Sequence, residues 1–131
     1  MNASGLRAVV LVDHGSREPG ANAVLDQMAA WLRERLPECP VRVAHMELAT
    51  PSLGEAIDAC VAEGAEEILV HPYFLAPGRH STTDIPALAA EAAERHPGVR
   101  VRVTAALGAH RAITEAILER LSERGDRSRP G

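Results

Sequence analysis

The stretch AVVLVDHGSR, residues 8–17, decides how the rest of the chain can fold. It begins with five consecutive apolar residues, 8–12, and this β-rich run predicts a strand that is buried on both faces. The turn residues Asp13, His14 and Gly15 follow at once and end the strand. Strands buried on both faces are typical of parallel sheets that are covered by helices.

Beyond this stretch, apolar periodicity predicts helices alternating with strands. Helices are expected at residues 22–36, 51–62 (with Thr50 as the cap), 85–95 and 110–124, and further strands at 41–48, 68–74 and 99–104. Alternation of strands and helices favours a parallel sheet whose strands are connected by right-handed crossovers through the helices. We therefore predict an α/β fold, a three-layer α/β/α sandwich with a four-stranded parallel sheet, similar to a flavodoxin-like half unit. Residues 1–124 would form one domain, and the polar residues 125–131 a disordered tail.

Composition excludes several classes of function. All 14 basic residues of the 131 are arginine. Without lysine there is no Schiff-base chemistry, no pyridoxal anchor and no Walker-type phosphate site. A net charge of −4 argues against a nucleic-acid partner. No apolar run has the roughly 18 residues of a membrane span, and no signal peptide is recognised at the start.

The two cysteines point to a reducing compartment. Cys39 and Cys60 form no CxxC pair, so we expect reduced thiols in a cytoplasmic protein. Aromatic residues are limited to Trp31, Tyr73 and Phe74, so the core must consist of Ala, Val, Leu and Ile.

Three side chains that can bind a metal follow predicted strands. His14 follows the first strand, Glu47 ends the second, and His80 lies in the loop after the third. Ligands of open parallel sheets bind at the carboxyl ends of the strands, so these residues are expected at one edge, with Glu47 between the histidines. Two imidazoles and a carboxylate suit Co²⁺, Fe²⁺, Ni²⁺ or Zn²⁺ and leave coordination positions open. The alternative is that each is a loop residue bonded to backbone.

Groups that can hold an anion lie at the same expected edge. Arg17 and Arg79 have the planar donor fork that suits carboxylate or phosphate. Hydroxyl and phenol donors could assist them; these are Ser16, Tyr73, Thr82 and Thr83. Equally, the arginines could be solvated surface charges, and residues 81–83 could merely cap the following helix.

The remaining histidines have less defined roles. His45 alternates with Glu47, which would place both on one face of the strand and let His45 support the metal. His96 precedes Pro97 at a helix end and is interpreted as structural, whereas His110 starts the last helix near the site. Roles for His45, His71 and His110 stay open.

Four segments in order resemble the small sirohydrochlorin chelatases, the CbiX and SirB group. They are VDHGSR (12–17), ELATPSL (47–53), HPYFLAPGRHSTTDIP (71–86) and LGAH (107–110), within a match over about residues 6–124. The resemblance implies a chelatase that inserts a divalent metal, Co²⁺ or Fe²⁺ and also Ni²⁺, into sirohydrochlorin without ATP or an organic cofactor. The metallated product would serve the synthesis of cobalamin or sirohaem.

The resemblance also implies residue roles and an assembly. Metal ligands of the family map onto His14, Glu47 and His80, which would also be the catalytic groups. Longer family members carry two such units, so a short chain implies a homodimer. The alternative function is that of a carrier, which binds metal or tetrapyrrole without catalysis. A third possible function is that of a phosphohydrolase that uses His14 and Arg17.

Overall fold

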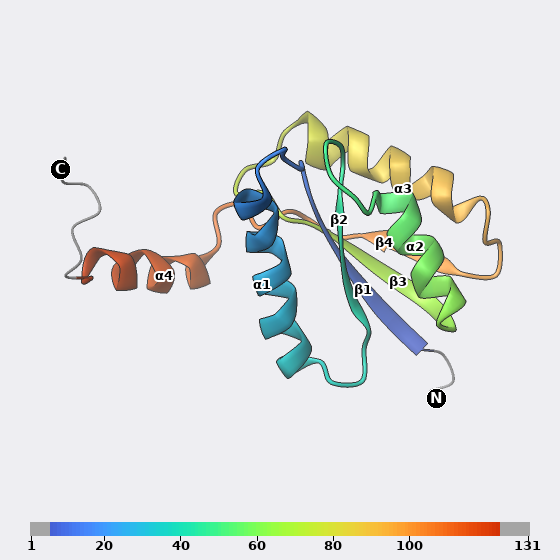
Figure 1. Cartoon of the computed structure of the whole chain (residues 1–131), viewed down its shortest axis with the longest axis horizontal. Helices are drawn as coiled ribbons and strands as arrows, with labels where there is room; N and C mark the ends of the chain where they lie inside the picture. The colour runs from blue at the N-terminus through green and yellow to red at the C-terminus, as the bar shows by residue number, and fades with distance from the viewer. Residues whose placement is uncertain (1–5, 124–131) are drawn as a thin grey trace.

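Residues 6–123 are described by the structure, which is a computed structural model. Four strands form one parallel sheet in the order β2-β1-β3-β4 (Figure 1). The elements are β1 (Leu6–Asp13), α1 (Pro19–Arg35), β2 (Val41–His45), α2 (Leu53–Ala62), β3 (Ala65–Pro72), the π-helical turn η1 (His80–Asp84), α3 (Ile85–Ala93), β4 (Arg100–Val103) and α4 (Arg111–Leu121). The prediction of a three-layer α/β fold is confirmed. The tail at 125–131 lies outside the described residues.

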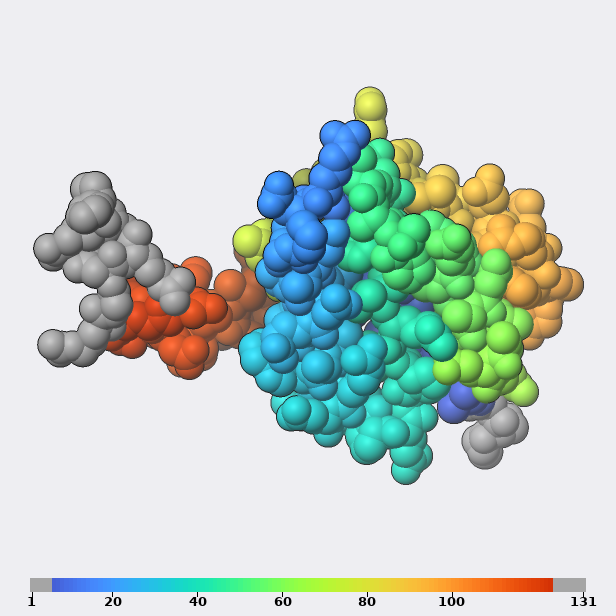
Figure 2. Space-filling view, viewed as in Figure 1, coloured from blue at the N-terminus to red at the C-terminus, as the bar shows by residue number. Residues whose placement is uncertain are grey.

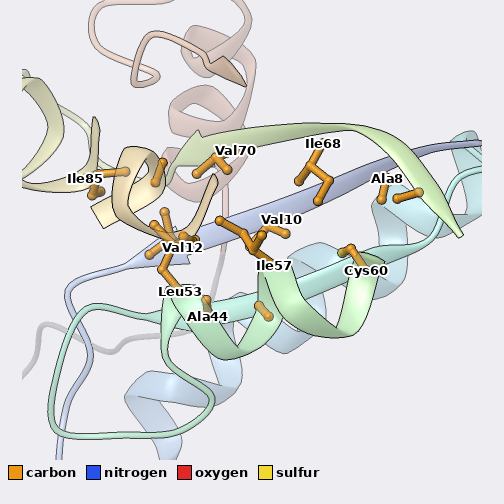
Figure 3. Close-up of a cluster of buried hydrophobic side chains, with 14 residues drawn as sticks. Ala8, Val10, Val12, Ala44, Leu53, Ile57, Cys60, Ile68, Val70 and Ile85 are labelled. Atoms are coloured by element: carbon orange, nitrogen blue, oxygen red, sulfur yellow. The ribbon is translucent and has the colours of Figure 1, made fainter. Parts of the chain in front are cut away.

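The larger part of the core lies between the sheet and the helices α2 and α3. It is built from Ala, Val, Leu, Ile and one cysteine, as the scarcity of aromatic residues predicts (Figure 3). Ile57 and Leu53 of α2 are fully or almost fully buried against Val10 and Val12 of β1. Burial raises the pKa of the Cys60 thiol to about 11, so this sulfur stays protonated and unreactive.

A smaller core cluster lies on the opposite face of the sheet. Leu25 and Ala29 of α1 pack there against Val9 and Leu11 of β1, and Val41 of β2 joins them. Helix α1 therefore covers only the half of this face that β1 and β2 form. Both cysteines are free; Cys60 is buried and Cys39 is partly buried.

The junction between β2 and α2 differs from the expectation. The strand ends at His45 rather than at residue 48, and the chain then turns through Leu48, whose φ is +70°. Helix α2 begins at Leu53, and its cap is Ser52 rather than Thr50. The Ser52 hydroxyl accepts from the Glu55 amide at 3.1 Å, while the Glu55 carboxylate accepts from the Ser52 amide at 2.8 Å. This reciprocal pair satisfies two amides that would otherwise lack partners.

Helix α4 stands apart from the sandwich. It extends away from the sheet on the α1 side, and none of its residues is buried (Figures 1 and 2). The expectation that helices cover both faces is therefore wrong for one region. Within residues 6–123, no helix packs on the α1-side face of β3 and β4. No described helix is both long and apolar enough to cross a membrane.

Candidate functional site

The carboxyl ends of β1 and β2 continue to pair beyond the sheet and hold two candidate ligands together. The Met46 amide donates to the Asp13 carbonyl at 2.9 Å, and the Glu47 amide donates to the His14 carbonyl at 3.1 Å. Gly15 follows with φ +96°, and a Cβ at this position would lie 1.9 Å from the Glu47 carbonyl oxygen. Only glycine allows this approach, so the backbone itself sets the spacing of His14 and Glu47.

Three candidate metal ligands meet at this edge. His14 Nε2 lies 3.0 Å from Glu47 Oε2, and the rings of His14 and His80 are 4.7 Å apart with an interplanar angle of 64°. Because β1 lies between β2 and β3, His14 is the central member, and the expected order with Glu47 in the middle is wrong. All three side chains are partly exposed to solvent. The site is therefore open enough to admit a ligand.

His80 is oriented by two neighbours. It begins η1, and its Nδ1 lies 3.1 Å from Asp84 Oδ2 one turn later. This contact leaves Nε2 as the ring nitrogen available to a ligand. On the other side, the Phe74 ring is nearly parallel to that of His80, with centroids 6.4 Å apart. Sequence reasoning missed both neighbours, although the i,i+4 spacing of His80 and Asp84 could have indicated the first.

The three candidate ligands do not form a coordination shell in this structure. Among residues 6–123, no three His, Cys, Asp or Glu side chains are already arranged to hold a metal ion. The reason is visible in the geometry, since the His14 and Glu47 side chains contact each other directly. A metal would have to separate this pair, exchanging one hydrogen-bonded contact for two metal–ligand bonds. We therefore describe the site as a candidate entry point for a metal rather than a closed cage.

A buried polar pair lies directly behind this edge. His45 Nδ1 is 2.6 Å from Asp13 Oδ1, and His45 is almost fully buried. Because β2 ends at His45, the alternation that would have placed it beside Glu47 does not continue. Its imidazole instead joins the last residues of β1 and β2, which are partners in the strand register. The sequence holds no local signal for this pair, because its members are far apart along the chain.

The candidate anion-binding residues divide into two groups. Arg17, Arg79 and Thr83 are exposed, and within the described chain their side chains make no hydrogen bond or ion pair. The Ser16 hydroxyl accepts from the Glu18 amide at 3.0 Å, and the Thr82 hydroxyl donates to the Gly78 carbonyl at 2.7 Å. Ser16 and Thr82 form the second group, and their hydroxyls help to hold the loops on both sides of the site.

The other residues predicted for the site lie away from the three candidate ligands or have structural partners. Tyr73 packs against the smaller core cluster on the α1 side. His71 contacts Thr104 Oγ1 at 2.8 Å, and burial lowers its pKa. His110 caps α4, since its Nδ1 accepts from the Ala112 amide.

His96 has a structural partner as well. Its Nε2 is 2.7 Å from the Asp58 carboxylate, as its interpretation as structural predicts.

Comparison with known proteins gives a consistent family. The model of the CbiX family matches residues 8–124. The chain is 41% identical over 113 residues to the chloroplastic sirohydrochlorin ferrochelatase of Arabidopsis thaliana, covering 86% of this chain and 50% of that protein. It spans about half the length of the first curated relatives that it matches.

Two solved structures share the fold. A CbiX protein from Marinobacter aquaeolei VT8 superposes with a TM-score of 0.75 at 30% identity, covering 88% of this chain and 93% of that one. The sirohydrochlorin chelatase SirB from Bacillus subtilis subspecies spizizenii, in complex with cobalt, superposes with a TM-score of 0.77 at 28% identity, covering 88% of this chain and 50% of that one. With its strand order, its edge of two histidines and a glutamate, and the family match over residues 8–124, the chain belongs to the CbiX family.

Proposed function

We propose that this protein inserts a divalent metal into sirohydrochlorin without nucleotide hydrolysis, with iron or cobalt as the metal. The observation that carries the proposal is the meeting of His14, Glu47 and His80 at the carboxyl edge of the sheet. Relatives named sirohydrochlorin ferrochelatase and cobaltochelatase support the reaction. The metal is here a substrate, and no organic cofactor is required by the chemistry. Nickel suits the same nitrogen and oxygen ligands.

The reaction needs a place for the metal and acceptors for two protons. Insertion joins M²⁺ to the macrocycle and releases the protons of two pyrrole N–H groups. A neutral imidazole can hold the metal or accept a proton, and its ordinary pKa near 6.5 suits both tasks. The Glu47 carboxylate offsets part of the dication's charge. We assign the metal to His14 and His80 together, and leave proton transfer to these histidines or Glu47.

Substrate recognition is assigned to the side chains around this edge. Sirohydrochlorin is rich in carboxylates, and the exposed guanidinium groups of Arg17 and Arg79 can each bind one through paired donors. Thr83 adds a hydroxyl donor. The Ser16 and Thr82 hydroxyls, engaged in loop contacts, would act mainly by holding these loops in place. Tyr73, packed on the α1 side, is the weakest member of this set.

We also propose a homodimer in the cytoplasm. The edge of a four-stranded sheet is narrow compared with a tetrapyrrole, so a second copy across a two-fold axis would supply the opposing wall of a cleft. Free cysteines and the net charge of −4 are consistent with a reducing compartment and with neither nucleic acid nor membrane as partner.

An absorbance assay tests the reaction. Purified protein with sirohydrochlorin and Co²⁺ should speed the spectral change beyond the spontaneous rate. His14→Ala and His80→Ala should each lower the rate by about a hundredfold or more, because each loses a ligand or base. His96→Ala is the matched control, since this histidine contacts Asp58 instead.

Thermal melts should show all three variants folded. Near-wild-type turnover in folded His14→Ala and His80→Ala would refute the site. A spectral shift on binding, without turnover by the wild type, would identify a carrier instead of an enzyme.

A further inference from the structure

The last paired residues of β1 and β2 make a polar contact inside the protein. Asp13 and His45 are register partners, and the two strands end at them. His45 Nδ1 lies 2.6 Å from Asp13 Oδ1, and His45 is only 3% exposed. Among residues 6–123, Ser81 is the only other polar residue that is buried. This contact is therefore an exception in an otherwise aliphatic interior.

Stability alone does not account for the contact. Burying two polar groups removes their hydration, and the hydrogen bond between them does little more than offset that loss. One register position earlier, Val12 and Ala44 hold the same two strands together with apolar side chains. An apolar contact tolerates small sliding movements, whereas a hydrogen bond fixes both the distance and the direction between two side chains. The polar pair therefore gives the strand ends a defined geometry.

His45 is held by three segments of the chain. Asp13 contacts its ring, and its backbone amide donates to the Pro51 carbonyl at 2.9 Å, in the loop before α2. The His45 Cβ lies 3.1 Å from the position that a Cβ on Gly15 would take. His45 thus joins the end of β1, the turn at Gly15 and the loop ahead of α2.

Two of the three candidate ligands lie within two residues of this pair. His14 follows Asp13 directly, and Glu47 comes two residues after His45. The Met46 amide donates to the Asp13 carbonyl and the Glu47 amide to the His14 carbonyl, so the backbone between the pair and the ligands is held on both strands. The 3.0 Å separation of His14 Nε2 and Glu47 Oε2 therefore depends on how firmly Asp13 holds His45.

We infer that Asp13 and His45 are positioning residues that set the spacing of His14 and Glu47 for a divalent metal. The inference rests on the proposed function for the identity of the ligand. Metal–ligand distances must be correct to within about 0.2 Å, so a small movement of either strand end weakens the site. The carboxylates of the tetrapyrrole are assigned instead to Arg17 and Arg79, whose long exposed side chains can follow such a movement. The pair should therefore govern affinity for the metal and leave affinity for the tetrapyrrole unchanged.

Calorimetric titration with Co²⁺ alone tests the inference without the macrocycle. Asp13→Ala should weaken Co²⁺ binding by about tenfold to a hundredfold, which is the effect of losing an outer partner in metal sites. Asp13→Asn keeps an oxygen that can accept from His45 Nδ1, and it should retain most of the affinity. In the absorbance assay, Asp13→Ala should raise KM for Co²⁺ and leave KM for sirohydrochlorin unchanged. Equal weakening of Co²⁺ binding by Asp13→Ala and Asp13→Asn would overturn the inference.

A double variant separates positioning from folding. Asp13→Val combined with His45→Leu replaces the polar pair by an apolar one, and urea denaturation should show it to be at least as stable as the wild type. Its Co²⁺ affinity should nevertheless fall as far as that of Asp13→Ala, because the apolar contact does not fix the distance between the strand ends. Wild-type Co²⁺ affinity in this folded variant would mean that the polar pair positions nothing.

A second histidine–aspartate contact provides the matched control. His96 Nε2 lies 2.7 Å from Asp58 Oδ1, beyond the end of α3 that is remote from His80. Asp58→Ala should therefore leave Co²⁺ affinity unchanged, and a loss as large as that of Asp13→Ala would reduce the inferred role to a general loosening of the fold.

The inference and the proposed function fail separately. A wild type that binds Co²⁺ in the way that these variants predict, but does not metallate sirohydrochlorin, supports the positioning role and rejects the chelatase. Turnover by a protein whose Co²⁺ affinity does not depend on Asp13 rejects the positioning role alone.

Discussion

At the scale of single residues, the orientation of His80 depends on a carboxylate that the sequence motifs did not single out. Asp84 Oδ2 lies 3.1 Å from Nδ1 of His80, which leaves Nε2 as the ring nitrogen available to a metal or a proton. Partners of this kind fix the tautomer and the ring orientation of a histidine. Asp84 is therefore a positioning residue in the proposed reaction.

Asp84→Ala should lower chelation by about tenfold to a hundredfold, since loss of such a partner has that effect in metal sites. Asp84→Asn keeps an oxygen acceptor and should retain more activity. Rates equal to that of the wild type in both variants would show that His80 does not need this partner.

At the scale of elements, the carboxyl ends of β1 and β2 form one structural unit. Gly15 lies against the Glu47 carbonyl, and the ladder between residues 13–14 and 46–47 continues outside the sheet. The spacing of the candidate ligands is thus a property of β1 and β2 together. Asp13 and His45 reinforce it from the buried side.

Gly15→Ala should impair both stability and chelation. Its Cβ would meet the Glu47 carbonyl at 1.9 Å, and φ of +96° disfavours any side chain. A forced conformation of this kind costs about 1–3 kcal/mol. Urea denaturation and the absorbance assay measure the two effects. Gly98→Ala is the control, because nothing lies within 4 Å of its Cβ position. Equal stability and equal chelation rates in the two variants would mean that the ends of β1 and β2 separate easily.

Most of the strands and helices could be predicted from the sequence, because apolar residues are spaced differently in buried strands and in amphipathic helices. The shared edge of His14, Glu47 and His80 was also predictable, because parallel strands end on one side. The pairing of Asp13 with His45 was not, since it depends on the register between two strands. The direction in which α4 leaves the sheet could not be predicted either. An apolar stripe indicates that a helix packs against something, but it does not identify the surface.

At the scale of the whole molecule, the contact between α2 and the end of α3 contributes to resistance to acid. The Asp58 carboxylate of α2 contacts His96 and Arg95 beyond the end of α3, and these contacts lower its pKa. A carboxyl with a lowered folded-state pKa contributes stability above its unfolded-state pKa, and that stability is lost as pH falls through the folded-state value.

Asp58→Asn should therefore reduce the free energy of unfolding at neutral pH by about 0.2–1 kcal/mol, the range of exposed ion pairs. The difference from wild type should shrink below about pH 3.8, the ordinary value for this group. Urea denaturation at several pH values checks this. Asp26→Asn, at an exposed position on α1, should show no such trend; a constant difference for Asp58→Asn would assign its effect to something other than charge.

The position of Trp31 has an optical consequence. It is the only tryptophan of the chain, and it lies half exposed on α1 rather than in the core. Indole emission shifts to shorter wavelength when water is removed from around the ring. The fluorescence of this protein would therefore report on whatever covers the outer surface of α1, and it would respond little to the packing of the aliphatic core.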